Sequence, residues 1–290
     1  MTQRPRGWRA RTFVALQHSL PQHRLSRLMY RLARVRWRPL KDLLIQILLR
    51  LYPIKMDEAA EPNPRAYPHF NAFFTRALAP DARPFDPAED AILSPVDGTI
   101  SQLGVIEDGC LIQAKGQSYS VVELLGGDLE RARAFHSGAF ATIYLAPSDY
   151  HRIHMPLAGT LAWMTHVPGR LFSVNATTAA LVPGLFARNE RVVCGFDSGA
   201  GTLVMVLVGA IFVGGIETVW AGEVTPATAR SPDTHAKPGD IRLERGEEMG
   251  RFNLGSTVIL LFEPGRMSWT PGLAPGDSVR LGERLGGLRE

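Results

Sequence analysis

A turn that feeds a strand is written twice in this sequence, as Pro95-Val96-Asp97-Gly98-Thr99-Ile100 and again as Pro156-Leu157-Ala158-Gly159-Thr160-Leu161. Proline and glycine suit tight turns, and the β-branched residues that follow favour an extended chain. A second repeated pair places Pro-Gly-Asp at residues 238–240 and 275–277, with Gly-Glu following at 246–247 and 282–283. The repeats therefore predict a compact, mostly antiparallel β domain.

Short apolar runs between such turns are rich in β-branched residues and bounded by glycine or proline, which is typical of strands. They cover residues 142–145, 203–208, 211–213 and 257–262. The turns resemble those of barrel-sandwich folds, the lipoyl- and biotinyl-carrier-like domains. A carrier function does not follow, since no Met-Lys-Met hairpin for attaching a prosthetic group is present. We expect residues 88–290 to form this β-rich domain.

Residues 1–56 differ in character, because arginines at 24, 27, 31, 34 and 38 adjoin an apolar stripe that contains Leu25, Leu28, Met29 and Leu32. This spacing predicts a basic amphipathic helix over residues 24–38. A second apolar helix is predicted between Pro39 and Pro53, with residues 40, 43, 44, 47, 48 and 51 on one face. The fold class is therefore α+β.

The acid-free start of the chain, where the first acidic residue is Asp42, must meet something anionic. A regular apolar stripe beside arginines favours a lipid surface over nucleic acid. A mitochondrial transit peptide has a similar composition, and that alternative stays open. The second helix either packs on the core or contacts the membrane. No run of about 18 apolar residues is present, so the chain is expected to lie on a membrane without crossing it.

Residues 57–87 are rich in proline and polar residues and are predicted to form a connector, in which Phe70, Phe73 and Phe74 dock a short helix on the core. Cys110 and Cys194 are the two cysteines of the chain. They give no disulfide framework and favour a reducing compartment, and neither is expected to be catalytic.

The dipeptide Gly255-Ser256 lies directly before the predicted strand 257–262. A serine hydroxyl there can add to the unhindered Gly255 carbonyl and form an ester by N-to-O acyl shift. Elimination from the ester leaves dehydroalanine, which hydrolyses to a pyruvoyl group and ammonia. The alternative is an ordinary glycine-serine turn before a strand.

A base for this step is sought at His151 and His154. These residues share a face if Ser148 or Asp149 caps a helical turn, and they point to opposite sides if the chain is extended. Either is otherwise a hydrogen-bonded core histidine. A His-x-x-His metal site is disfavoured, because no third ligand stands out. Asp97 is either a common turn residue or the carboxylate that holds His154 in the right tautomer.

Seven segments together resemble phosphatidylserine decarboxylases of the bacterial type. They are residues 70–76, 94–98, 149–156, 167–175, 186–191, 216–222 and 250–257. The resemblance implies that Asp97, His154 and Ser256 form a self-cleavage relay that breaks the Gly255–Ser256 bond. The cleavage would divide the protein into a β chain (1–255) and an α chain (256–290). Residues 88–290 are then the catalytic domain. The stretch 225–237 departs from the family's usual sequence.

The resemblance also implies a covalent pyruvoyl cofactor made from Ser256, with no metal. Its carbonyl forms a Schiff base with phosphatidylserine and takes up electrons as CO2 leaves, giving phosphatidylethanolamine. We assign the proton donor to His151, whose ring can carry a proton near neutral pH, and a substrate contact to Ser173. Expected partners are the substrate, an anionic membrane at the cytoplasmic face of the cell, and the chain's own two fragments. Nucleic acid is not expected, and a homo-oligomer stays open.

Three rival functions remain at this stage. A pyruvoyl decarboxylase of a soluble amino acid would not need the lipid-facing N-terminus. A non-enzymatic barrel-sandwich binding module would purify as one uncut chain. A serine autoprotease would stop after cleavage and leave an ordinary N-terminal serine. The mass and chemistry of the mature chain separate these functions.

Overall fold

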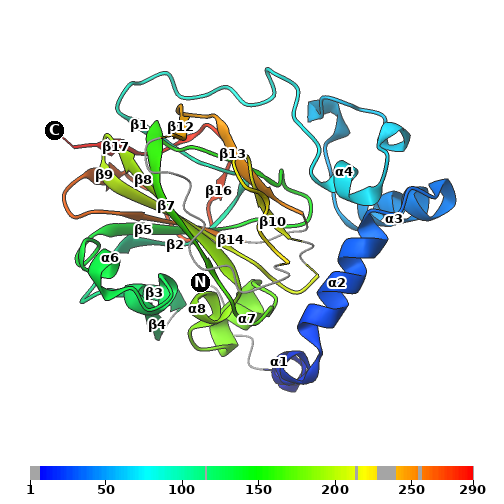
Figure 1. Cartoon of the computed structure of the whole chain (residues 1–290), viewed down its shortest axis with the longest axis horizontal. Coiled ribbons are helices and arrows are strands. Elements are labelled where there is room, and N and C mark those ends of the chain that lie inside the picture. The colour runs from blue at the N-terminus through cyan, green and yellow to red at the C-terminus, as the bar shows by residue number, and fades with distance from the viewer. Residues whose placement is uncertain (1–6, 115, 213–214, 227–239, 254–256, 290) are drawn as a thin grey trace.

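The computed structural model describes residues 7–114, 116–212, 215–226, 240–253 and 257–289. Three helices lead into a β-rich body, along whose side they lie (Figure 1). The α+β class is therefore confirmed. The helices are α1 (Trp8–Ser19), α2 (Gln22–Ala33), α3 (Arg38–Leu51), α4 (Phe70–Phe74), α5 (Val121–Leu124), α6 (Leu129–Arg133), α7 (Ala176–Leu181) and α8 (Leu185–Arg188). Over the described ranges, no helix is both long and apolar enough for a membrane span.

Eight antiparallel strands form the central sheet, in the order β12-β7-β8-β9-β14-β5-β2-β16. Smaller sheets are β11-β10-β13-β6, β1-β17-β15 and β3-β4. The strands are β1 (Ala91–Leu93), β2 (Gly98–Val105), β3 (Cys110–Ala114), β4 (Gln117–Ser120), β5 (Ala139–Tyr144), β6 (Arg152–His154), β7 (Gly159–Val167), β8 (Arg191–Ser198), β9 (Gly201–Val208), β10 (Ile216–Thr218), β11 (Gly222–Glu223), β12 (Arg242–Leu243), β13 (Glu248–Phe252), β14 (Thr257–Phe262), β15 (Met267–Trp269), β16 (Ser278–Val279) and β17 (Arg284–Leu288).

The two sequence repeats occupy equivalent corners of this sheet. β2 and β7 begin at Gly98 and Gly159, and each pairs at its start with a two-residue edge strand, β16 or β12. The glycines that follow, Gly246 and Gly282, have φ values of +82° and +86°, and a Cβ on either would clash with the ring of Phe85. The predicted turns that feed strands are therefore confirmed at 95–100 and 156–161. Pro238 and Gly239 of the second repeat lie outside the described residues.

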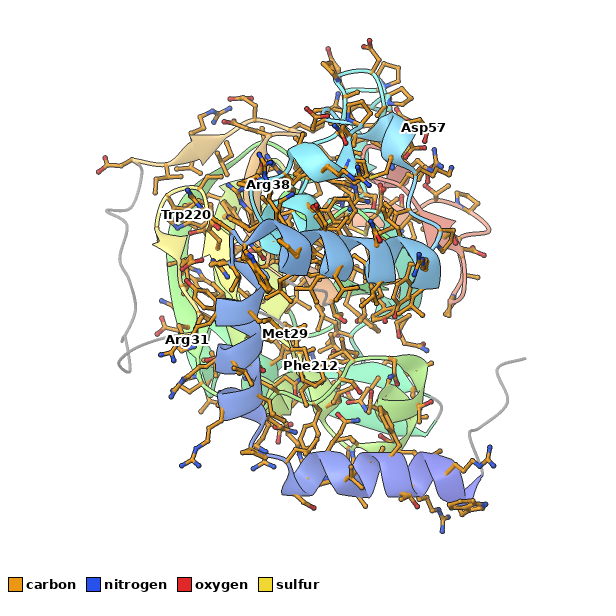
Figure 2. The ribbon with its side chains drawn as sticks, turned by 90° about the vertical axis from the view of Figure 1, so that its right-hand side faces the viewer. Met29, Arg31, Arg38, Asp57, Phe212 and Trp220 are labelled. Atoms are coloured by element: carbon orange, nitrogen blue, oxygen red, sulfur yellow. The ribbon has the colours of Figure 1, made fainter. Side chains whose placement is uncertain are left out.

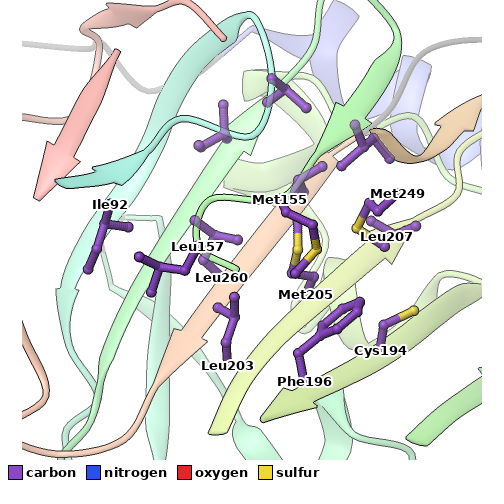
Figure 3. Packing of buried hydrophobic residues seen from close by; sticks show 14 of the residues in the cluster. Ile92, Met155, Leu157, Cys194, Phe196, Leu203, Met205, Leu207, Met249 and Leu260 are labelled. Atoms are coloured by element: carbon purple, nitrogen blue, oxygen red, sulfur yellow. The ribbon is translucent and has the colours of Figure 1, made fainter. Parts of the chain in front are cut away.

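The core lies on both faces of the central sheet, because β14 alternates its side chains between two apolar clusters. Val258, Leu260 and Phe262 pack in one cluster, and Ile259 and Leu261 in the other. Figure 3 shows the first cluster, which residues of β8, β9 and β14 share with Met155 and Met249. A strand buried on both faces has a continuous apolar sequence, which is why residues 257–262 were predictable.

The runs at 142–145 and 203–208 fall on β5 and β9 as predicted, with Leu145 one residue beyond β5. The strand predicted at 211–213 is wrong. Ile211 and Phe212 form a turn in which Phe212 has a φ of +65°, and Val213 lies outside the described residues. A left-handed backbone ends a strand, whatever its side chains favour.

The N-terminal helices differ in detail from the prediction (Figure 2). Helix α1 was not predicted, and α2 ends at Ala33 instead of reaching Arg38. Arg34 pairs with Glu223 instead of continuing the helix. Helix α3 starts with Pro39 in its first turn, where a missing backbone N–H costs little.

Helix α3 divides its apolar residues between the body and the exterior. Lys41 and Ile45 are buried, and Ile45 packs with the aromatic residues of α4. Leu43, Ile47 and Leu51 remain exposed. The predicted apolar stripe is therefore only partly buried, because the two most buried residues of α3, Lys41 and Ile45, do not belong to it. The predicted short helix that docks Phe70, Phe73 and Phe74 is confirmed as α4.

Candidate active site

The candidate site lies where β14 begins, at one end of the central sheet. Thr257 is paired with Tyr144 of β5 on one side and with Val208 of β9 on the other. The predicted cleavage residues, Gly255 and Ser256, lie outside the described residues. Their neighbours Asn253 and Thr257 are described and buried, so these two residues locate the site.

His151 is fully buried beside the end of β13. Its backbone carbonyl accepts the N–H of Phe252 at 3.0 Å, and its ring packs on Phe74 with 4.1 Å between centroids. The Nδ1 atom lies 2.8 Å from the Asp149 carbonyl. A carbonyl can only accept, so Nδ1 carries the hydrogen and Nε2 has a free lone pair.

Burial lowers the pKa of His151 to about 3, because the charged ring would lose its hydration. The role of His151 as proton donor stays a prediction, and the lowered pKa means that the neutral ring is favoured. His151 is a neutral imidazole whose Nε2 accepts, and it must first receive a proton before it can donate one.

His154 lies on β6 and is also buried enough that desolvation lowers its pKa. Its Nδ1 donates to the Gly246 carbonyl at 2.8 Å, and the Tyr150 hydroxyl lies 3.1 Å from Nε2. Because Nδ1 carries the hydrogen, the hydroxyl donates to Nε2. The chain is extended here, so the second alternative for the two histidines holds, and their rings contact different elements.

Asp97 is buried in the turn before β2 and pairs with Arg83. The guanidinium donates from Nε to Oδ1 at 2.9 Å and from Nη2 to Oδ2 at 2.5 Å. The Leu281 N–H donates to Oδ1 at 2.9 Å. This pairing raises the pKa of Arg83, so the site holds a permanent ion pair.

No hydrogen bond joins Asp97 to His154 in the part of the chain that the structure describes. The tautomer of His154 is set by Gly246, which fills the role predicted for Asp97. The two residues are still close neighbours, since the His154 N–H donates to Pro95 at 2.9 Å. Burial is the largest influence on the pKa of His154 and lowers it. The Asp97 carboxylate acts in the opposite direction, because its negative charge favours the charged ring. Their joint role in cleavage stays a prediction.

Ser173 lies on a segment that Asn189 ties to the same end of the sheet. Asn189 accepts the Phe172 N–H at 3.1 Å and donates to the carbonyls of Phe172 and Gly209, each at 2.8 Å. Gly209 follows Val208, the β9 partner of Thr257. The structure therefore brings Ser173 to the strand ends that carry the site.

Several buried polar atoms lack a partner among the described residues, and three of them belong to His151, Asn253 and Thr257: His151 Nε2, Asn253 Nδ2 and Thr257 Oγ1. Leaving such an atom unpaired costs about 1–3 kcal/mol, so each one needs an explanation such as a functional role. Asn253 and Thr257 stand on either side of residues 254–256 in the sequence, and their side chains can donate to a carbonyl group formed there.

Sequence reasoning missed Arg83 and Asn71 as parts of this site. Asn71 Nδ2 donates to Asn253 Oδ1 at 3.0 Å and so fixes the residue that precedes 254–256. Arg83 lies in the connector, where no pattern marks it as the partner of Asp97. Asn71 belongs to the segment 70–76, but its side chain shows its partner only in the folded chain.

Two histidines whose pKa values are lowered by burial make the fold sensitive to acid. Both folded pKa values lie below the unfolded value of about 6.5, so the stabilisation is complete above that pH and is lost as the pH falls below it, for His151 toward its folded pKa of about 3. We expect each histidine to remove up to about 1.4 kcal/mol of unfolding free energy per pH unit. Urea unfolding of the uncut Ser256→Ala chain between pH 7.5 and 4.5 measures this loss.

His151→Gln in the Ser256→Ala chain should reduce the loss of unfolding free energy at low pH, because one of the two histidines no longer titrates. The same substitution at the exposed His136 serves as the matched control. Equal slopes for His151→Gln and its parent would contradict the assignment of a neutral buried ring.

Comparison with known proteins identifies the family of this chain. The family model described as "Phosphatidylserine decarboxylase" matches residues 70–287, and a second, described as "PSD", matches residues 12–53. The chain belongs to the phosphatidylserine decarboxylase family. It is 56% identical over 279 residues to the phosphatidylserine decarboxylase proenzyme of Azotobacter vinelandii, covering 95% of this chain and 98% of that one. The proenzymes of Stutzerimonas stutzeri and Methylococcus capsulatus are 57% and 51% identical, over 95% and 96% of this chain and 94% and 96% of theirs.

Membership in the family gives the activity: the chain is a proenzyme that decarboxylates phosphatidylserine. Proenzymes of this family carry a pyruvoyl group derived from serine. The buried Nδ2 atom of Asn253 and Oγ1 atom of Thr257, which lack partners among the described residues, fit such a group, because these residues stand on either side of residues 254–256 in the sequence.

Proposed function

We propose that the chain cuts itself between Gly255 and Ser256 and that the pyruvoyl group formed from Ser256 serves decarboxylation at the end of β14. The observation that carries this proposal is a pair of buried polar atoms without partners among the described residues, Asn253 Nδ2 and Thr257 Oγ1, which stand on either side of residues 254–256 in the sequence. In this proposal Asp97 and His154 serve the cleavage, whereas His151 and Ser173 serve the lipid substrate.

His154 can take the Ser256 proton only at Nε2, since its Nδ1 hydrogen is held by Gly246. The Tyr150 hydroxyl donates to Nε2 in the uncut chain, so this base becomes available when that hydroxyl moves aside. Asp97 then stabilises the protonated ring through its charge. Its contacts with Arg83 hold the carboxylate in place.

A pyruvoyl group supplies a ketone that condenses with an amine and takes up the electrons released as CO2 leaves. The substrate amine must lose a proton before it can react. His151 Nε2 carries a buried lone pair that can hold a proton, and the Asp149 carbonyl then stabilises the charged ring through Nδ1–H. The same proton can be returned to the product, so His151 still serves as proton donor.

Intact-mass analysis of the purified protein tests the proposal. We expect fragments 1–255 and 256–290, with the smaller one blocked to Edman sequencing and altered by borohydride. The fragments should copurify until denatured, because β14 of the smaller fragment is fully buried between β5 and β9 of the larger. A single uncut but active chain would overturn the proposal, and an unblocked serine would favour a simple autoprotease.

The N-terminal helices support a peripheral position on an anionic membrane, at the cytoplasmic face of the cell. Apolar side chains are exposed along them, including Trp8, Leu16, Leu28, Trp37 and Leu51. Arg24, Arg27 and Arg31 are exposed on α2, and Figure 2 shows this helix with Arg31 labelled. A surface with apolar side chains beside cations suits the headgroup region of a bilayer.

Vesicle binding tests this position. Each arginine near an anionic leaflet contributes roughly 1 kcal/mol, so replacing Arg24, Arg27 and Arg31 by glutamine should weaken binding to vesicles rich in anionic lipid roughly 100-fold at low salt. Co-sedimentation with vesicles measures the partition coefficient. A matched variant replaces Arg133, Arg242 and Arg289, which are exposed on the β-rich body, and should bind as the parent does. Equal losses in both variants would show that net charge, not α2, drives binding.

We also propose that the β-rich domain resembles barrel-sandwich folds. The equivalent corners at Gly98 and Gly159, where β2 and β7 begin, support this proposal.

A further inference from the structure

The segment that carries Ser173 is held by hydrogen bonds to two buried glutamine side chains of the N-terminal helices. Gln17 Oε1 accepts the Ser173 N–H at 2.8 Å, and Gln22 Oε1 accepts the Leu171 N–H at 2.9 Å. Each glutamine is 3% exposed. Gln22 Nε2 donates to the Gln17 carbonyl at 2.8 Å, which links the two contacts. Helices α1 and α2 thus hold this segment.

The amide orientation of Gln17 follows from these contacts. A backbone N–H needs an acceptor, so the oxygen of Gln17 must face Ser173 N, and its nitrogen must be the atom 3.1 Å from Ser173 Oγ. Asn175 is fixed in the same way, because its Oδ1 caps α7 by accepting the N–H groups of Thr177 and Thr178. Its Nδ2 is therefore the atom 3.5 Å from Ser173 Oγ.

Two donors thus approach the oxygen of one hydroxyl. A serine hydroxyl has two acceptor lone pairs and one hydrogen, so Gln17 and Asn175 leave only the hydrogen for a further contact. No described residue accepts that hydrogen. A hydroxyl restricted to donating suits an anionic oxygen, and the substrate headgroup offers a carboxylate and a phosphate.

We propose that Gln17 is a positioning residue that keeps the Ser173 hydroxyl as a hydrogen-bond donor to an anionic oxygen of the substrate headgroup. The inference rests on the proposed function, in which Ser173 contacts the lipid. Helix α1, through Gln17, therefore sets the polarity of a group in the substrate site as well as exposing Trp8 and Leu16.

Gln17→Glu tests this with almost no change of shape. An ionised carboxylate accepts from both the N–H and the O–H of Ser173, which turns the hydroxyl hydrogen away from the substrate. We expect kcat/KM for short-chain phosphatidylserine in micelles to fall roughly 10- to 100-fold, the loss of one hydrogen bond to a charged group. Gln22→Glu, at equal burial and without contact to Ser173, is the matched control for a buried charge. Because it turns an oxygen toward the Gln17 carbonyl, we expect a loss of kcat/KM that is smaller than in Gln17→Glu and that does not depend on the Ser173 hydroxyl.

Two measurements distinguish an effect on the orientation of the Ser173 hydroxyl from an effect on the packing around residue 17. Once protonated, the carboxyl group introduced by Gln17→Glu can donate to Ser173 Oγ again, so the activity of this variant relative to the parent should recover as the pH falls. Arg170, His18 and His23 are the charged or titratable groups on the adjoining elements, and Gln22→Glu shares them. Ser173→Ala should give a similar loss, and combining it with Gln17→Glu should add little.

Product binding distinguishes the two headgroup anions. Phosphatidylethanolamine keeps the phosphate but lacks the carboxylate, so a phosphate contact predicts weaker product inhibition in Gln17→Glu and a carboxylate contact predicts unchanged product inhibition. Asn175→Asp, which keeps the cap of α7 but reverses the second donor, should lower kcat/KM in the same direction and decides the matter if Gln17→Glu does not fold. A fully cut Gln17→Glu enzyme with the parent's kcat/KM overturns this inference alone, whereas an uncut parent overturns the proposed function.

Discussion

Ser256→Ala is expected to give a single uncut chain with no decarboxylase activity. Alanine has no hydroxyl to add to the Gly255 carbonyl, and it cannot become a ketone. Both the cleavage and the cofactor are therefore lost at once, which makes this the largest effect expected of any substitution in the chain. Denaturing electrophoresis and CO2 release from labelled phosphatidylserine measure the two losses. The variant should still fold, because the described strands on both sides of residues 254–256 pair before cleavage.

Ser173→Ala is the matched control, since it removes a hydroxyl at the same end of the sheet. It should be cut like the parent chain, because Ser173 is assigned to the substrate and not to the cleavage. A Ser256→Ala chain that is still cut would place the broken bond elsewhere. A Ser173→Ala chain that stays uncut would show that cleavage depends on the surroundings of Ser173.

Sequence patterns predicted those parts of the fold whose burial is regular. The continuous apolar run 257–262 became the fully buried β14, and the repeated turns became the corners before β2 and β7. Helix α1 escaped prediction because its apolar residues form no single stripe and its buried residues include Gln17. The strand predicted at 211–213 failed because composition does not reveal the left-handed backbone of Phe212.

The sequence allowed us to predict which residues form the candidate site, but not which residues they hydrogen-bond to. Asp97, His151 and His154 were selected for chemistry that their side chains can perform, and the structure places them around the start of β14. Their hydrogen bonds go instead to Arg83, Asp149 and Gly246, which come from a connector and two turns. Such contacts depend on the folded chain, and no local spacing encodes them. The low pKa of His151 follows from burial, which sequence alone could not quantify.

The second large effect is a separation of functions between the two histidines. His154→Gln should slow self-cleavage by roughly 100- to 10,000-fold, the usual contribution of a general base. His151→Gln should be cut and should gain the pyruvoyl group, but its kcat should fall by a similar factor, because the glutamine amide cannot hold and return a proton as an imidazole can. Time courses of cleavage and of CO2 release measure the two rates separately.

Each histidine variant serves as the control for the other. The rings are three residues apart, burial lowers the pKa of both, and both donate Nδ1–H to a backbone carbonyl. Glutamine can keep that backbone contact while removing the Nε2 lone pair, so a difference between the variants reports on Nε2 and not on folding. If both variants remain uncut, His151 also belongs to the cleavage machinery. If His154→Gln is cut at the parent's rate, the base lies elsewhere, and the Tyr150 hydroxyl that faces Nε2 is only a structural partner.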